Sequence, residues 1–237
     1  MQRLLENIKD AVKPVYDSIE EWPHSWPHIF LVVNYSITLS SGEHIDPTFP
    51  VIAAFCHDLG RVEEEKLKKE KGKSPPHALL SIEPTCRILE KEGISGIPYG
   101  EIVEAVAVHS YKDYTGGNNL VKILQDADRL SALGPRGFLG SISHFAGVNY
   151  VDVQRIKSAE GNPEALKGLC TKTIDNISRI KDYKTINVKG IFKGLNFVLE
   201  WYDMLHFALS KQIIHDDFIY LKEMTKKLAD CLKENGR

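Results

Sequence analysis

Helical periodicity is the feature that most constrains the fold of this chain. Apolar residues recur every three to four positions along most of its 237 residues, and convincing runs of alternating apolar and polar residues, the pattern of a half-buried strand, are absent. Helices with an apolar stripe have to bury it against one another. We therefore predict an all-α fold, a compact bundle of ten helices. The expected helices cover residues 2–20, 28–41, 48–60, 77–93, 100–110, 119–133, 150–158, 163–182, 190–210 and 215–234.

One charged stretch lacks the helical pattern. Residues 63–76 are rich in Lys and Glu, contain Leu67 as their only large apolar residue and end in Ser-Pro-Pro. This composition is typical of a solvent-exposed segment. We expect an exposed connector here, either a plain solvated loop or a lid that closes over a neighbouring site.

The distribution of polar residues indicates how the chain is organised. Most histidines and aspartates that suit chemistry lie before about residue 135, whereas residues 160–237 have the pattern of amphipathic packing helices. No linker rich in Pro, Gly or Ser separates the two parts. We therefore predict a single domain over residues 1–237, with its core in 20–135 and a C-terminal helical extension in 136–237.

Charge and composition exclude several classes of partner. Thirty basic against thirty-two acidic side chains give a formal net charge of −2, so we expect no bulk binding to nucleic acid. No uncharged apolar run reaches the roughly 18 residues of a membrane span, and the N-terminus lacks the apolar region of a secretory signal. Four widely spaced cysteines fit reduced thiols. We expect a cytoplasmic protein that does not bind membranes.

The strongest local signal for chemistry is the pair His57 and Asp58. The two residues end an apolar helix and are followed by Leu-Gly-Arg. A neutral imidazole and a carboxylate form a mixed ligand pair that suits Zn, Mn, Fe or Mg. The alternative is that the two side chains hydrogen-bond each other and cap the neighbouring backbone.

Two further polar residues lie in apolar surroundings. His28 stands in the first turn of an apolar helix, where a lone histidine is more often structural, and Asp128 interrupts an otherwise buried stripe of another helix. A carboxylate in an apolar helix is costly unless it is paired or bound to metal. Three helices that each offer one such group to a shared centre would explain all of these positions together.

The same residues lie in three short motifs. These are His24-Ser-Trp-Pro-His28, Cys56-His-Asp-Leu-Gly-Arg61 and Leu124-Gln-Asp-Ala-Asp-Arg-Leu130. They resemble the H-D-x-x-H, H-D-[IL]-G-R and Q-D-A-D-R-L motifs of the HD-domain superfamily of metal-dependent phosphohydrolases, whose signature is H…HD…D. The resemblance covers about residues 20–135.

This resemblance implies an all-helical fold of at least five helices around a buried divalent-metal site. It implies His28, His57, Asp58 and Asp128 as the metal ligands. The family pattern favours Asp128 over Asp126, which would then support a ligand or the fold. The ligand set accepts Mn, Mg, Fe, Ni or Zn, as one ion or two per chain, and does not distinguish among them.

Two more histidines, His77 and His109, lie where some branches of the superfamily bind a second metal. In members with one metal, similar histidines instead contact phosphate or protonate the leaving group, and a structural role is the remaining alternative. The chain departs from the family at Ser25 and Ser131, where many members have Asp. These departures bear on the substrate rather than on metal binding.

The resemblance implies hydrolysis of a phosphoester or phosphoanhydride of a small phosphorylated metabolite, with a nucleotide as the favoured class. Asp58 would orient or deprotonate the attacking water, and His77 or His109 would stabilise the leaving oxygen. Arg61 and Arg129, each beside a ligand, would contact the substrate phosphate or else form salt bridges.

Two other functions stay open at this stage. A di-iron oxygenase resembling inositol oxygenase would need both His77 and His109 as ligands, and a metal-bearing regulatory or binding module would have no turnover. Hydrolysis is favoured because it is the majority activity of the family. The sequence also leaves a homo-oligomer open, although the aromatic stretch 192–209 suits a core better than a dimer surface. His24 is expected near the mouth of the site.

Overall fold

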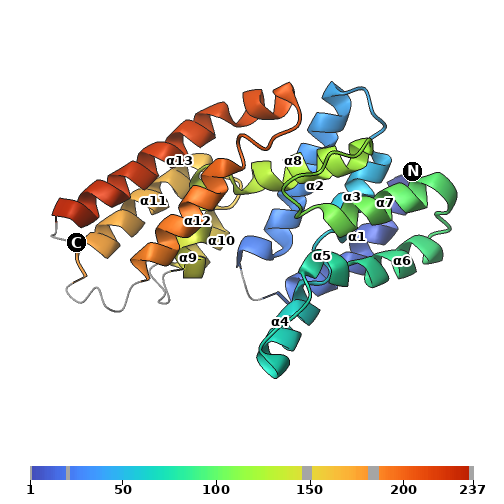
Figure 1. Cartoon of the computed structure of the whole chain (residues 1–237), viewed down its shortest axis with the longest axis horizontal. Helices are drawn as coiled ribbons and strands as arrows, with labels where there is room; N and C mark the ends of the chain where they lie inside the picture. Colours follow the sequence, from blue (N-terminus) through green and yellow to red (C-terminus); the bar gives the residue numbers. More distant parts are fainter. Residues whose placement is uncertain (1, 20–21, 146–150, 181–186, 235–237) are drawn as a thin grey trace. The chain divides into compact units, whose positions relative to one another are not determined.

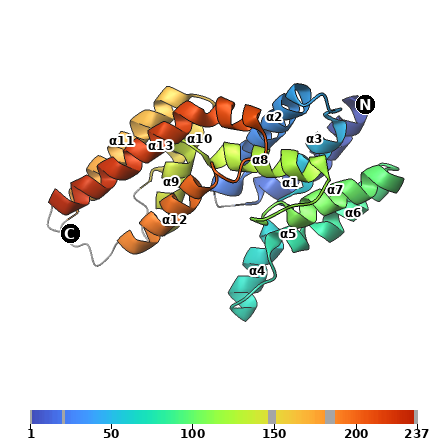
Figure 2. The same ribbon diagram turned by 45° about the horizontal axis from the view of Figure 1, so that its top comes forward.

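Every regular element in the described part of the chain is a helix. The computed structural model describes residues 2–19, 22–145, 151–180 and 187–234, and Figures 1 and 2 show their helices in two views. The all-α prediction is therefore confirmed. None of the described helices is long and apolar enough to cross a membrane.

The chain divides into two compact units, Met1–Leu130 and Ser131–Arg237. The first contains α1 (Gln2–Asp17), η1 (Trp22–His24), α2 (Trp26–Gly42), α3 (Thr48–Cys56), α4 (Arg61–Lys71), α5 (His77–Leu80), α6 (Ile82–Lys91), α7 (Gly96–Val108) and most of α8 (Asn119–Ala132). The second contains α9 (Pro135–Phe145), α10 (Val153–Ala159), α11 (Pro163–Ser178), α12 (Val188–Glu200) and α13 (Ala208–Glu234). The prediction that both form one domain stays a prediction.

Helix α3 lies at the centre of the first unit. It packs against α1, α2 and α7, and every side chain from Val51 to Cys56 is buried. A short helix that is apolar on all its faces belongs inside a core. The polar residues that follow it are carried into the interior as well, so that His57 is 0% exposed and Asp58 is 1% exposed.

Specific partners hold the carboxyl end of α3. The hydroxyl of Tyr16 on α1 donates a hydrogen bond of 2.8 Å to the carbonyl oxygen of Phe55, and the ring of Trp26 stacks on Phe55 with centroids 6.1 Å apart. The last carbonyls of a helix have no partner within it, and leaving a buried one unpaired costs about 1–3 kcal/mol. Tyr16 and Trp26 therefore fix the segment that leads into His57 and Asp58.

Most of residues 63–76 are exposed or partly exposed, as expected. The expectation of a loop is wrong up to Lys71, because these residues belong to helix α4. Acidic residues stand in its first turn and lysines in its last, which suits the helix dipole. Ion pairs one turn apart, such as Lys68 with Glu64 at 3.1 Å, add to this. The helix ends at Gly72, whose φ of 71° is left-handed.

The second unit is built around α9, which packs against α11, α12 and α13 (Figure 2). The sequence did not predict α9, because Gly137, Gly140 and its serines are weak helix formers. A Cβ on Gly137 would overlap the carbonyl oxygen of Ala132. Close packing, rather than intrinsic propensity, therefore stabilises this helix.

Several predicted boundaries also differ from the structure. The helix expected over 77–93 is divided at Ser81 into α5 and α6, and the one expected over 190–210 ends at Glu200. Residues 20, 150, 181 and 182 of other predicted helices lie outside the described residues.

A glycine joins the turn after α3 to α5. The backbone N–H of Gly60 donates to the Ser81 hydroxyl at 2.8 Å, and that hydroxyl donates to the His77 carbonyl oxygen at 2.9 Å. A Cβ on Gly60 would overlap this carbonyl oxygen and lie 2.7 Å from the carbonyl carbon of Leu80. The absence of a side chain therefore lets α5, which carries His77, approach the His57-Asp58 turn.

We predict that Gly60→Ala lowers the free energy of unfolding by about 1–3 kcal/mol, because the added methyl group overpacks the contact with α5. The matched control is Gly100→Ala in α7, where a Cβ meets open space. That change should be neutral or raise stability by up to about 1 kcal/mol. Urea unfolding followed by circular dichroism measures both. Equal effects of the two substitutions would contradict the assigned packing role of Gly60.

Candidate metal centre

Histidine side chains from four elements converge on the carboxylate of Asp58. His28 lies in the first turn of α2, His57 directly follows α3, His77 begins α5 and His109 directly follows α7. The Nε2 atoms of His28 and His57 lie 3.9 and 3.8 Å from Oδ2 of Asp58. Those of His77 and His109 lie 3.2 and 3.7 Å from its Oδ1. All of these residues belong to the first unit.

The ends of α3 and α7 orient their histidines in the same way. Nδ1 of His57 lies 2.8 Å from the carbonyl oxygen of Ala54, and Nδ1 of His109 lies 2.7 Å from that of Val106. Because a carbonyl oxygen only accepts hydrogen bonds, Nδ1 carries the hydrogen in both rings. Each Nε2 therefore presents its lone pair to the centre, as in metal-binding histidines.

Asp128, on α8, completes the predicted ligand set. Its Oδ1 lies 3.4 Å from Nε2 of His28 and 3.9 Å from Nε2 of His57, and the two histidine nitrogens are 3.3 Å apart. Ligands about 2.1 Å from one ion are themselves about 3.0–3.4 Å apart in octahedral or tetrahedral geometry. The observed separations equal or slightly exceed these values, so the residues fit a divalent cation.

Asp58 gives an independent reason to expect a cation. Both of its oxygens are buried and form no hydrogen bond of ordinary geometry. A buried carboxylate without such partners carries a large desolvation cost. A divalent ion bound by neutral imidazoles and carboxylates would remove that cost.

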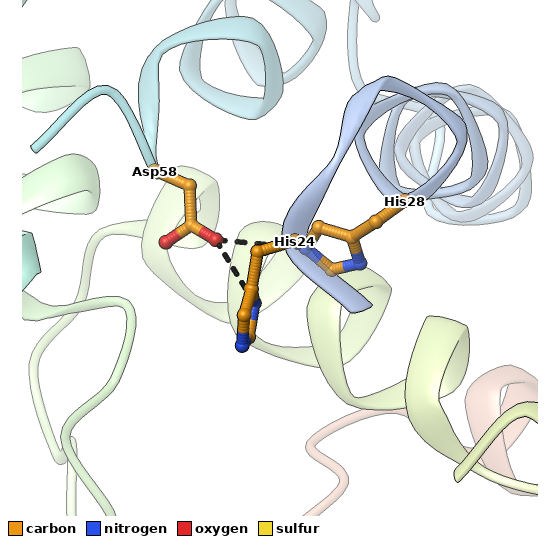
Figure 3. Close-up of side chains that lie close together, drawn as sticks. All are labelled: His24, His28 and Asp58. Carbon is orange, nitrogen blue, oxygen red and sulfur yellow. Dashed lines mark ion pairs between the residues drawn. The ribbon is translucent and has the colours of Figure 1, made fainter. Parts of the chain in front are cut away.

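Within the described residues, three overlapping groups have ligand atoms within 4.8 Å of one another. They are His24–His28–Asp58, His28–His57–Asp128 and His57–Asp58–His109. The four predicted ligands are thus distributed over the three groups rather than collected in one. Figure 3 shows the first group, in which the rings of His24 and His28 both face Asp58.

The two further histidines predicted from the sequence are also brought together. Nε2 of His77 and Nε2 of His109 lie 3.1 Å apart, beside Oδ1 of Asp58 and on the other side of the carboxylate from His28. This is again a separation that two ligands of one ion adopt. A second metal and a contact to phosphate both stay predictions for this pair.

Arg61 and Glu64 surround the same side of Asp58. Nε of Arg61 lies 3.1 Å from Oδ1 of Asp58, and Oε2 of Glu64 lies 3.8 Å from the Arg61 guanidinium and 3.7 Å from Nδ1 of His77. Glu64 is not among the predicted site residues, because residues 63–76 have the composition of an exposed connector. Its spacing of three residues from Arg61 on one helix face was the available signal.

Arg129 is buried and directed at the backbone. Its guanidinium donates to the carbonyl oxygen of Tyr111 at 3.3 Å and lies 3.9 Å from the buried Asp126. Gln125 donates to the carbonyl oxygens of Tyr111 and of Val108, just before His109. These contacts hold the segment after α7. A contact between Arg129 and substrate phosphate stays a prediction.

Burial and charge shift the pKa values at this site. Burial raises the pKa of Asp58, but the Arg61 guanidinium and the His57 imidazole outweigh it, so that the carboxyl pKa lies well below its usual range. Burial lowers the pKa of His57 and lowers the pKa of His77 to about 2, against the attraction of Asp58. Asp58 is thus ionised, and His57 and His77 are neutral, near pH 7.

We predict that the metal-free protein loses stability as the pH falls below about 6.5. The unfolded chain protonates His57 and His77 near the usual value of 6.5, whereas the folded chain keeps both neutral. The unfolded state therefore binds more protons. His77 contributes about 1.4 kcal/mol per pH unit below that value, and the lowered pKa of His57 adds to the slope in the same direction. Urea unfolding between pH 5 and 8 with chelator measures the slope. His77→Gln should reduce it by about one proton, and an unchanged slope would refute the assignment.

Comparisons with known proteins agree with this fold. The model of the HD domain family matches residues 26–133. The crystal structure of Bacillus subtilis YpgQ in complex with ADP is similar over 97% of this chain and 95% of that chain, with 18% identity and a TM-score of 0.60. The selenomethionine form of the same protein covers 97% and 94%, with 17% identity and a TM-score of 0.59. No curated protein matches the chain.

The residues that the family model matches include every histidine and aspartate of the centre except His24. At 17–18% identity, the likeness to YpgQ shows the fold. Residues 26–133 of this chain are therefore identified as an HD domain.

Proposed function

We propose that this protein is a metal-dependent phosphohydrolase that cleaves a phosphoester or phosphoanhydride bond of a small phosphorylated metabolite. The observation that carries the proposal is the buried carboxylate of Asp58, which is ringed by histidine Nε2 atoms and has no ordinary hydrogen bond. HD domains bind divalent metals, and most members of the family are phosphohydrolases. The complex of YpgQ with ADP supports a nucleotide as the substrate class.

In this proposal His28, His57, Asp58 and Asp128 hold one divalent ion, of Mn, Mg, Fe, Ni or Zn. The bound ion would act as a Lewis acid toward the phosphate and lower the pKa of a water molecule toward about 7. The carbonyl contact of His57 preserves the lone pair that this role requires.

The remaining residues would act on the substrate itself. Asp58, ionised near neutral pH, orients the attacking water through Oδ2. Arg61, on the Oδ1 side, neutralises charge on the transferred phosphate. Nε2 of His77 lies beside the same oxygen, and with the hydrogen of the ring on this atom it would donate to the leaving oxygen as negative charge develops there. Nε2 of His109, which presents a lone pair, would instead accept a hydrogen bond or bind a second metal.

We expect Asp58→Asn to abolish both metal binding and activity. The wild type, reconstituted with Mn²⁺, should carry one equivalent of metal by elemental mass spectrometry and release phosphate from at least one member of a nucleotide panel. The variant should lose the metal and at least roughly 100-fold in rate, because the neutral amide cannot replace the carboxylate ligand. Asp10→Asn, at an exposed position of α1, is the matched control. Wild-type protein without metal after reconstitution would refute the proposal.

The variant His77→Ala distinguishes a centre that binds one metal ion from a centre that binds two. We expect the variant to keep its single equivalent of metal and to lose about 10²–10⁴-fold in rate, because a group at the leaving oxygen contributes that much. A wild type with two equivalents that falls to one in His77→Ala would instead show a dinuclear centre, for which the 3.1 Å His77–His109 pair is suited. If the protein contains iron, consumes oxygen and releases no phosphate, the result would favour the oxygenase function.

A further inference from the structure

His24 is a histidine of this site that the family match does not cover. It ends the short helix η1, two residues before the matched residues begin. Its ring faces Asp58 from the same side as that of His28 (Figure 3). Nδ1 of His24 lies 3.5 Å from Oδ2 of Asp58, the shortest approach of a histidine nitrogen to this oxygen among the ion pairs described above.

The side chains of His24, His28 and Asp58 differ in their exposure to solvent. The side chain of His24 is 27% exposed, whereas that of His28 is 5% exposed and that of Asp58 is 1% exposed. Nδ1 of His24 is nevertheless buried and forms no hydrogen bond. The nitrogen that faces Asp58 therefore belongs to the most solvent-exposed of the three side chains, and its one described partner is Oδ2 of Asp58, beyond the length of an ordinary hydrogen bond.

The spacing of the three ligand atoms suits a hydrogen-bonded oxygen atom. Nδ1 of His24, Nε2 of His28 and Oδ2 of Asp58 all lie within 4.8 Å of one another. Atoms this far apart can all approach one oxygen to about 2.7–3.0 Å, the length of a hydrogen bond. His24 shares a group with His28 and Asp58 but none with His57 or Asp128, so it lies on the His28–Asp58 side of the proposed metal ligands.

We propose that Nδ1 of His24 and Oδ2 of Asp58 together hold the water molecule that attacks phosphorus. This inference rests on the proposed phosphohydrolase function and assigns a catalytic role to His24. One O–H of the water points to Oδ2 and the other to the lone pair of Nδ1. The lone pair of the oxygen then faces the substrate, which is the orientation that in-line attack requires.

Hydrolysis forms one bond to phosphorus and breaks another. A bond forms between the water oxygen and phosphorus, and the bond between phosphorus and the leaving oxygen breaks with its electron pair going to that oxygen. The water proton that points to Oδ2 passes to the Asp58 carboxylate and from there neutralises the leaving oxygen. The hydrogen that points to Nδ1 of His24 stays on the transferred oxygen as the P–OH group of the product, so His24 neither gains nor loses a proton.

The experiment compares His24→Ala, His24→Asn and His24→Gln in Mn²⁺-reconstituted protein. The amide group of Asn reaches the position of Nδ1, whereas that of Gln reaches the position of Nε2. The control is His44→Asn, at an exposed loop histidine with a φ of 56°, a conformation that Asn tolerates. Thermal unfolding and Mn content are measured for each variant, so that misfolding or metal loss is recognised.

We expect all variants to fold and to keep the Mn²⁺ of the wild type. His24→Ala should lower kcat by about 10²-fold or more with little change in KM, because only the orientation of water is lost. His24→Asn should recover at least about 10-fold of that loss, and His24→Gln should recover less. Loss of Mn²⁺ would make His24 a metal ligand, a raised KM with unchanged kcat would make it a substrate contact, and unchanged kinetics would leave it without a role. Each of these three results overturns the inference.

A second readout does not depend on activity. Crystal structures of the Mn²⁺-loaded wild type and of His24→Ala should show an ordered oxygen within hydrogen-bond distance of Nδ1 and Oδ2 in the first, and none at that place in the second. If the wild type hydrolyses no nucleotide, the proposed function fails. The inference about His24 is then decided by this comparison, and an empty position in the wild type refutes it.

Discussion

The burial of one negative charge governs the first unit of this protein. Asp58 lies at the end of a helix that is apolar on every face, so its carboxylate enters the core with α3. An ionised group in that position is tolerated only if cationic or strongly dipolar groups surround it. Imidazoles from α2, α5 and α7, together with Arg61 from α4, supply that surrounding. The packing of these helices in the first unit therefore also brings the side chains of the site together.

Most of the side chains that the structure brings together around Asp58 were singled out from the sequence, because a polar residue within an apolar run is easy to recognise. His57 and Asp58 follow an uninterrupted apolar run, and Asp128 interrupts another, so each is visible as a polar group where none is expected. The spacing of His28, His77 and His109 carried meaning only through the resemblance to HD domains. The structure shows the physical basis of that spacing, since helix ends deliver these side chains to one point.

The parts that the sequence did not predict depend on tertiary contacts. The charged residues after Arg61 have the composition of a loop, yet dipole-matched charges and ion pairs make them a helix, and this places Glu64 beside His77. Helix α9 has poor intrinsic propensity, and Gly137 permits the close packing that stabilises it. The contact of Arg129 with the backbone at Tyr111 was likewise not predicted, and its contact with a substrate phosphate stays a prediction. Neither composition nor periodicity reports such contacts.

The arrangement of ligands along the chain has a consequence for folding. His28 and His57 are separated by 29 positions, and His77 and His109 by 32, so any ion held among them joins segments that are remote in the chain. Such a cross-link restricts the unfolded ensemble much as a disulfide would, but it forms only after the intervening helices have docked. A metal ion bound at this centre would therefore act as a reversible cross-link between the helices of the first unit.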